Sequence, residues 1–78
     1  MYFVYLLECA DGALYTGITN NLEKRLTAHR AGNASAYTRA HGARRFVYVE
    51  HHKTRSDALK REAAIKKLSR SEKRKLCG

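Results

Sequence analysis

The sequence predicts an α+β fold, a three-stranded antiparallel sheet flanked by helices in the order β-β-α-β-α-α. Three segments, 2–9, 13–18 and 45–52, are rich in the aromatic and β-branched residues that favour strands. The first is apolar on both faces, which predicts a central strand. The segments after the second and third carry capping residues and apolar residues at helical spacing. Since three strands are too few to bury a core alone, we expect helices to cover the sheet.

Length and composition favour a globular protein with a single domain, residues 1–78. A chain of 78 residues supports one modest core, and its hydrophobic share of 44% argues against disorder. No apolar run approaches the ~20 residues of a membrane-spanning helix, and the apolar start meets Glu8 at once, which argues against a signal peptide. Two cysteines are too few for a disulfide framework, so we expect a cytoplasmic location. Cys9 is expected in the core and Cys77 in a frayed tail.

The charge of the chain predicts a polyanionic partner. Sixteen Lys and Arg against seven Asp and Glu give a net charge of +9, which is typical of proteins that bind nucleic acid. The alternatives are a domain that is basic for solubility and a ribosome-associated protein. We expect seven basic side chains to follow a phosphate backbone without reading bases: Arg39, Arg44, Arg45, Lys60, Arg61, Lys66 and Lys67.

The loop of the first hairpin decides whether Tyr5 and Tyr15 can meet. A two-residue Asp-Gly loop would turn the two tyrosines to opposite faces of the sheet. A three-residue loop, with Gly12 in the left-handed conformation, would pair Cys9 with Ala13 and put both rings on one face. We expect the second register.

The same register gives a reason for a glycine in the second strand. It places Gly17 opposite Tyr5, where the missing side chain leaves room above the sheet for a ring or a phosphate. The alternative is that both tyrosines are ordinary strand aromatics.

Each helix boundary is predicted from a capping or stop residue. Residues 33–43, which are small and polar, are expected to form a loop with one helical turn. The final helix follows a Ser-x-x-Glu capping box. The predicted helices begin after Asn20, after Thr54 or Ser56, and after Ser69, and they end near Ala31, Leu68 and Leu76.

The first helix is expected to carry two polar side chains toward the sheet. One stripe is formed by Leu22, Arg25, Leu26 and His29. Since the leucines must face the core, Arg25 and His29 face it too, and the planar fork of Arg25 matches a phosphate. The alternatives are an ion pair of Arg25 with Glu8 or Glu50, and a structural role for His29.

A carboxylate lies on the apolar side of the next helix. Glu62 falls between Leu59 and Ile65, on the side predicted to be buried. Such a violation of the pattern favours a functional role. Mg²⁺ often takes only one or two protein carboxylates and keeps its waters for a phosphate, so Glu62 is a candidate metal ligand. The alternative is a salt bridge with Arg25 or Arg39.

These residues, in this order, resemble the GIY-YIG nuclease superfamily, in particular its small stand-alone single-domain bacterial members. Phe3-Val4-Tyr5 stands at the first motif, with only the Tyr kept, and Tyr15-Thr16-Gly17 at the second, with Tyr and Gly kept. The helix Arg, the aromatic or His one turn later and the metal-binding Glu correspond to Arg25, His29 and Glu62. Residues 15–30 and 59–68 match the stretches typical of these members.

The resemblance implies an endonuclease that hydrolyses phosphodiester bonds of DNA with one divalent ion, Mg²⁺ or Mn²⁺. Tyr5, Tyr15, Arg25 and His29 would be catalytic. A tyrosine would supply or hold the nucleophile, Arg25 would stabilise charge on phosphorus, and Glu62 would hold the metal. Which tyrosine is the base stays open, with a slight preference for Tyr5.

Two departures from the family pattern bear on activity. Ile18 stands where several members have Lys, and no late Asn follows Glu62. With no second domain in the sequence to choose a target, we expect structure- or strand-selective cleavage of single-stranded or branched DNA. The competing hypothesis is a non-catalytic nucleic-acid-binding module that keeps the nuclease fold.

Overall fold

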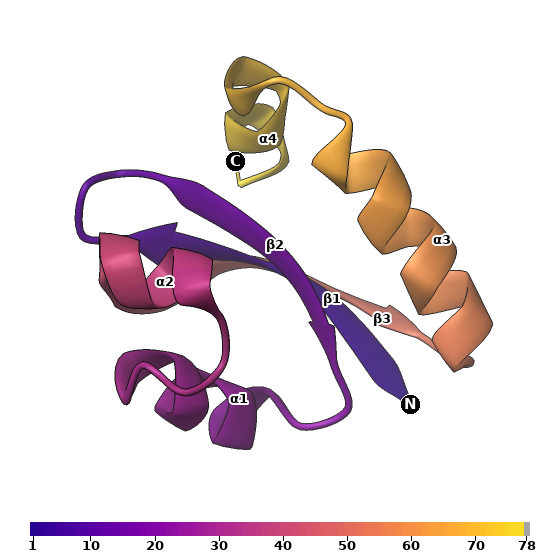
Figure 1. The fold of residues 1–78 in the computed structure, drawn as a ribbon. Coiled ribbons are helices and arrows are strands. Elements are labelled where there is room, and N and C mark those ends of the chain that lie inside the picture. Colours follow the sequence, from indigo (N-terminus) through magenta and orange to yellow (C-terminus); the bar gives the residue numbers. More distant parts are fainter. Residues whose placement is uncertain (78) are drawn as a thin grey trace.

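Two helices lie on each side of a central sheet (Figure 1). The computed structural model describes residues 1–77. The elements along the chain are β1 (Tyr2–Cys9), β2 (Leu14–Thr19), α1 (Leu22–Arg30), α2 (Ala36–His41), β3 (Ala43–His52), α3 (Arg55–Lys66) and α4 (Arg70–Leu76). The sheet is antiparallel with the order β2-β1-β3, so β1 is central as expected. The predicted fold class is confirmed, and α2 is the helical turn expected within residues 33–43.

The β1–β2 hairpin has the register expected from a three-residue loop. The Cys9 N–H donates to the Ala13 carbonyl at 2.8 Å, and Gly12 has a φ of +84°, the left-handed conformation that glycine adopts without strain. The Cα pairing along the two strands puts Tyr5 and Tyr15 on the same face of the sheet. The prediction that the two rings can meet is therefore confirmed.

The aliphatic core lies between the sheet and α3. Val4 and Leu6 of β1 and Ala58 and Ile65 of α3 are all 0% exposed and form one cluster. Cys77 packs against this cluster, and its thiol donates to the Lys73 carbonyl at 3.4 Å. The prediction of a frayed tail at Cys77 is therefore wrong, because α4 folds back onto the sheet.

The start of α1 lies one residue later than predicted. The Thr19 hydroxyl bonds to the backbone N–H and carbonyl of Asn21, and this turn extends β2 to Thr19. The Asn21 side chain then accepts the Lys24 N–H at 3.0 Å. Asn21 rather than Asn20 is therefore the N-cap.

The later caps lie where the sequence placed them. Thr54 caps α3, and Ser69 forms a complete capping box with Glu72 at the start of α4. Helix α3 ends at Lys66, before the predicted Leu68. It ends there because the N–H groups of residues 67 and 68 bond to carbonyls three residues back, which tightens the last turn.

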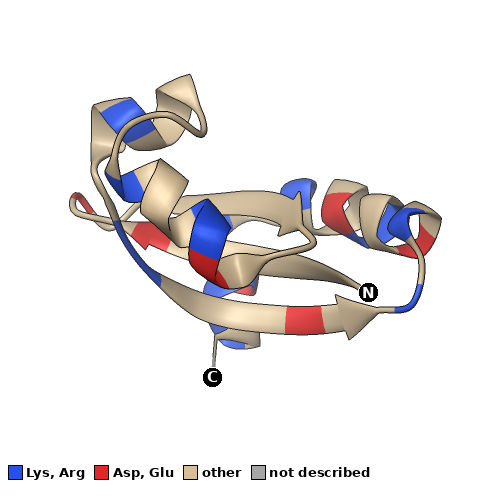
Figure 2. Cartoon of the chain, turned by 90° about the horizontal axis from the view of Figure 1, so that it is seen from below, with Lys and Arg blue, Asp and Glu red and all other residues tan. Residues whose placement is uncertain are grey.

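Lys and Arg are spread over several helices and β3 rather than gathered on one element (Figure 2). Among residues 1–77, no helix combines the length and apolar character needed to traverse a bilayer.

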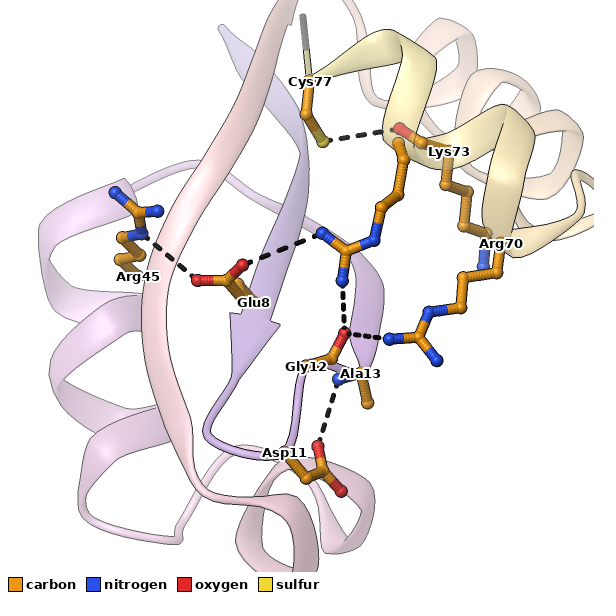
Figure 3. Close-up of polar contacts among 9 residues, drawn as sticks. Glu8, Asp11, Gly12, Ala13, Arg45, Arg70, Lys73 and Cys77 are labelled. Atoms are coloured by element: carbon orange, nitrogen blue, oxygen red, sulfur yellow. Dashed lines mark hydrogen bonds and ion pairs between the residues drawn. The ribbon is translucent and has the colours of Figure 1, made fainter.

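Two arginines tie α4 to the turn of the first hairpin (Figure 3). Arg70 and Arg74 each donate to the Gly12 carbonyl, at 3.1 and 2.8 Å. Arg74 also lies 3.9 Å from a carboxylate oxygen of Glu8, which faces Arg45 on its other side. These contacts hold the last helix against the sheet and place its basic side chains beside the hairpin.

Candidate active site

Gly17 accommodates the ring of Tyr5. The two residues lie opposite each other in the hairpin, and a Cβ on Gly17 would overlap the Tyr5 ring and hydroxyl. The prediction that Gly17 leaves room above the sheet for a ring is therefore confirmed, and the ring is that of Tyr5. The centroids of the Tyr5 and Tyr15 rings lie 6.4 Å apart.

His29 joins α1 to β1 and α2 through two hydrogen bonds. Its Nε2 lies 2.8 Å from the Tyr5 hydroxyl oxygen, and its Nδ1 lies 2.8 Å from Thr38 Oγ1. All three residues are buried, with at most 2% of their surface exposed. In the neutral tautomer that carries its proton on Nδ1, the Tyr5 hydroxyl donates to Nε2 and Nδ1–H donates to Thr38 Oγ1; in the other neutral tautomer both directions are reversed. Thr38 Oγ1 also lies 2.9 Å from Ser35 Oγ.

Burial keeps this pair neutral. It raises the pKa of Tyr5 well above its ordinary value; Tyr15 and Glu62 add to the increase, and Arg25 opposes it. Burial, followed by the charge of Arg25, lowers the pKa of His29. The Tyr5–His29 pair therefore resists ionisation at either group near neutral pH.

Tyr15 is more accessible than Tyr5. It is half-buried, and its hydroxyl has no hydrogen-bond partner within residues 1–77. Its ring lies against that of His29, with centroids 5.3 Å apart. Of the two tyrosines, Tyr15 is the one that a substrate can reach without displacing a hydrogen bond.

Arg25 lines an open hollow of about 310 Å³ at the start of α1. Arg25 is half-buried, and its guanidinium forms no hydrogen bond or ion pair within residues 1–77. The carboxylates considered as its partners are engaged elsewhere: Glu8 with Arg45 and Arg74, Glu50 with Arg61 and His52. A free guanidinium in a hollow can receive an anion.

The leucines of α1 are less buried than expected. Leu22 and Leu26 are both half-buried, whereas His29 is the one buried residue of this helix. The prediction that the leucines anchor the helix in the core is only partly correct, because His29, bonded to β1 and α2, takes the central position.

Glu62 reaches the site from the other side of the sheet. Its side chain is 15% exposed, and its one ion pair within residues 1–77 is with Lys66, at 3.6 Å. The Lys66 side chain is 55% exposed. Neither Arg25 nor Arg39 pairs with it among the described residues. The charge of Glu62 raises the pKa of Tyr5, so its carboxylate acts within electrostatic range of that hydroxyl.

One of the two residues predicted to flank Glu62 on the buried side of the helix is exposed. Ile65 is buried, but Leu59 is 37% exposed and does not belong to the buried side. The reason is that α3 contacts the sheet through a narrow stripe containing Ala58 and Ile65.

Glu62 fits the role of a lone carboxylate ligand. Within residues 1–77, no three His, Cys, Asp or Glu side chains are grouped so that they could hold a metal ion among themselves. A mostly buried carboxylate with one long pair to an exposed lysine retains much of its accepting capacity. One hard divalent ion, completed by water and a substrate phosphate, would match that donor set.

The predicted backbone-binding residues lie on three different elements and one helix cap. Arg39 lies on α2, and Arg44 and Arg45 lie on β3. Three more lie on α3, Lys60, Arg61 and Lys66, and Lys67 is the C-cap of that helix. Six of the seven are exposed.

Arg61 is the half-buried exception. Its Nε donates to Glu50 at 2.8 Å, in a network that includes Tyr48 and His52. Burial alone would raise the pKa of Glu50, but the hydrogen bonds from these three residues lower it. This arrangement ties Arg61 to β3 rather than leaving it free for a ligand.

Two contributors to the site lie outside the sequence-based prediction. Thr38 bonds His29, and Phe46 of β3 packs on Tyr5 with ring centroids 4.8 Å apart. Ser35 could have indicated Thr38 from the sequence, because Ser35 is the N-cap of α2 and its side chain accepts the Thr38 N–H. No local signal marks Phe46, because its contact depends on the β1–β3 pairing.

Comparison with known proteins identifies relatives along nearly the whole chain. The family model described as the GIY-YIG catalytic domain matches residues 1–75. A UPF0213 protein of Clostridium perfringens is 49% identical over 76 residues, which is 97% of this chain and 82% of that protein. A UPF0213 protein of Desulfotalea psychrophila is 50% identical over 76 residues, 96% of this chain and 69% of that one. The solution NMR structure of a UPF0213 protein from Bacillus halodurans is 38% identical, with a TM-score of 0.60, and is matched over 97% of this chain and 82% of its own.

Proposed function

The chain belongs to the GIY-YIG family of nucleases, and from this premise we propose that it cleaves DNA by hydrolysis with one divalent ion, Mg²⁺ or Mn²⁺, held by Glu62. The observation that carries the proposal is the convergence on Tyr5. His29 bonds its hydroxyl, Tyr15 lies beside its ring, and Arg25 and Glu62 both act on its pKa. The positive charge of Arg25 suits a phosphate, and the negative charge of Glu62 suits a cation.

Arg25 is proposed to bind the scissile phosphate. Arg25 is half-buried and its guanidinium has no partner within residues 1–77, so a phosphate would supply the missing hydrogen bonds. Charge builds up on the phosphate oxygens in the transition state, and a guanidinium placed there stabilises it more than the ground state.

Glu62 is proposed to position the divalent ion. When bound, such an ion stabilises charge on a phosphate or leaving oxygen. Glu62 lies between the buried residues Ala58 and Ile65 along α3, and its side chain is 15% exposed.

Tyr15 is proposed as the tyrosine that contacts the attacking water. Its hydroxyl is accessible and unbonded within residues 1–77, whereas Tyr5 is buried, bonded to His29 and held neutral. In this assignment Tyr5 and His29 are positioning residues that hold Tyr15 through ring contacts. The preference for Tyr5 as the base is replaced here by Tyr15.

The exposed basic residues support structure- or strand-selective cleavage. Side chains such as Arg39, Arg44 and Lys67 offer charge to a phosphate backbone but no fixed pattern of donors for base edges.

The test is cleavage of labelled single-stranded, duplex and branched DNA with Mg²⁺, with Mn²⁺ and with chelator. We expect cleavage only with a divalent ion, and losses of about 100-fold or more for Glu62→Gln and for Arg25→Ala. Glu23→Gln, which makes the same change at an exposed carboxylate of α1, is the matched control and should cleave within about 3-fold of the parent. A folded Glu62→Gln protein that cleaves like the parent would refute the one-metal arrangement.

A second candidate is a non-catalytic nucleic-acid-binding module. Two features favour it: the burial of Tyr5, with its raised pKa, and the apolar Ile18 at a position where several family members carry Lys. Salt-dependent DNA binding without cleavage of any form by any divalent ion would support this alternative.

A further inference from the structure

A stack of aromatic rings leads from Tyr15 to the protein surface. The ring centroids of Tyr15 and Tyr37 lie 5.7 Å apart. Those of Tyr37 and His41, one turn apart on α2, are separated by 4.2 Å with an interplanar angle of 31°. Tyr37 is 42% exposed, so this part of the stack meets solvent and contributes little to the core.

The outer end of the stack is held in place. His41 Nδ1 bonds to the carboxylate of Asp11 in the hairpin loop, and that carboxylate also accepts the Ala13 N–H at 3.1 Å. These contacts fix the imidazole of His41 against the ring of Tyr37. The carboxylate of Asp11 is engaged by both hydrogen bonds. A flat ligand would meet a surface that is already formed.

A hollow beside Tyr37 is lined in part by cationic side chains. Its volume is about 250 Å³, and it is lined by Ala13, Leu14, Tyr37, Arg70 and Lys73. Arg70 donates to the Gly12 carbonyl, and Figure 3 shows its side chain beside that of Lys73. The Lys73 ammonium has no hydrogen bond or ion pair within residues 1–77. An exposed ring next to free positive charge complements a base followed by its phosphate.

We propose that Tyr37 and His41 form a stacking subsite for one unpaired nucleobase of DNA, with Lys73 and Arg70 facing the adjoining phosphates. The choice of DNA as the ligand rests on the proposed function. Within a duplex both faces of a base are covered by its neighbours, so the subsite selects single-stranded or frayed DNA. Because Tyr37 touches Tyr15, the bound base would lie next to the nucleotide being cleaved, which gives the proposed strand selectivity a structural origin.

The test measures binding without cleavage. Fluorescence anisotropy in chelator compares labelled oligothymidylate of about 12 nucleotides with an abasic oligonucleotide of the same length. We expect the parent to prefer the base-containing strand by about 5-fold or more. Tyr37→Ala should weaken binding of oligothymidylate by roughly 5- to 100-fold and leave the abasic strand within about 2-fold, whereas Tyr37→Phe keeps the preference.

Two controls separate stacking from charge and from lost apolar surface. Lys73→Gln should weaken binding of both strands equally, because it removes a phosphate contact. Leu59→Ala shortens a similarly exposed apolar side chain, 37% exposed, on the other side of the sheet, and should change neither affinity. If Tyr37→Ala fails to fold, Tyr37→Leu, which keeps apolar bulk but has no aromatic ring, takes its place and should lose the preference.

Three other outcomes of these measurements would refute the subsite, the choice of DNA or the nuclease proposal. Equal affinity of the parent for both strands, or equal losses on both strands for Tyr37→Ala, refutes the subsite while any divalent-dependent cleavage keeps the proposed function. Tenfold tighter binding of oligouridylate than of oligothymidylate refutes the assignment to DNA. A base preference that depends on Tyr37, without cleavage by any divalent ion, keeps the subsite and refutes the nuclease proposal.

Discussion

The two faces of the sheet are equally buried but differ in chemistry. On the α3 side, Val4 and Leu6 meet Ala58 and Ile65, and no hydrogen bond joins these side chains. On the α1 side, Tyr5 lies between those two strand residues and is bonded to a buried histidine. One strand thus supplies a dry core to one face and a polar, aromatic site to the other, because successive side chains alternate. Stability and chemistry should therefore be separable by substitution.

Glu62 connects the two faces. Its helix belongs to the aliphatic side, yet its charge acts on the Tyr5 hydroxyl on the other side. The packing of Ala58 and Ile65 therefore sets the position of the proposed metal ligand.

The largest expected effect is on activity at the polar face. Tyr15→Phe removes the accessible hydroxyl and should lower cleavage by about 100-fold or more, while the melting temperature stays near that of the parent. Tyr5→Phe, the matched variant, should mainly destabilise, because the buried Nε2 of His29 loses its partner. Cleavage rates and thermal melts on both variants check this. A fully active Tyr15→Phe together with an inactive, stable Tyr5→Phe would return the role of base to Tyr5.

The next effect is on stability at the aliphatic face. Ile65→Ala opens a cavity beside Val4 and Leu6 and should cost about 2–5 kcal/mol in the free energy of unfolding. Ile65→Val should cost about 0.5–1.5 kcal/mol and cleave within about 3-fold of the parent. Urea unfolding gives the energies. If Ile65→Val unfolds like the parent but loses cleavage, stability and chemistry are not separable between the two faces.

A smaller loss is expected from Thr38→Val. The substitution keeps the shape of the side chain but leaves Nδ1 of His29 without its hydrogen-bond partner in a buried site, at a cost of about 1–3 kcal/mol. Thr38→Ser, which keeps the hydroxyl, should recover most of this loss. Urea midpoints of the three proteins provide the measurement, and equal stability of the valine variant would show that this hydrogen bond contributes nothing.

The smallest effect is a pH dependence at His29. Its pKa is lowered in the folded protein, so the unfolded chain binds a proton more readily, and stability falls as pH drops below the unfolded value of about 6.5. The slope has a limit of about 1.4 kcal/mol per pH unit for one group. The carboxylates Asp11 and Glu50, with lowered pKa values, add their own losses at lower pH. Urea unfolding between pH 5 and 8 should show a shallower slope for His29→Gln than for the parent; equal slopes would contradict the assignment.

Local patterns were sufficient where the structure depends on neighbours in the chain. The Ala-Asp-Gly loop led to the correct register, and Thr54 and Ser69 are caps as expected. The pattern failed at Asn20, where the neighbouring Thr19 hydroxyl moved the turn by one residue. It failed also at Leu59, since helical spacing tells which residues share a side but not how wide the contact with the sheet is.

The sequence by itself determined the order of the elements, the face shared by Tyr5 and Tyr15, and the residues that correspond to the family motifs. Only the tertiary structure decided the partners of the polar side chains. His29 bonds Tyr5 and Thr38, Glu50 takes Arg61, and Arg25 keeps its guanidinium free. Spacing along one helix or strand carries no information about these choices, because each depends on the distance between groups on different elements and on which competing charge lies nearer.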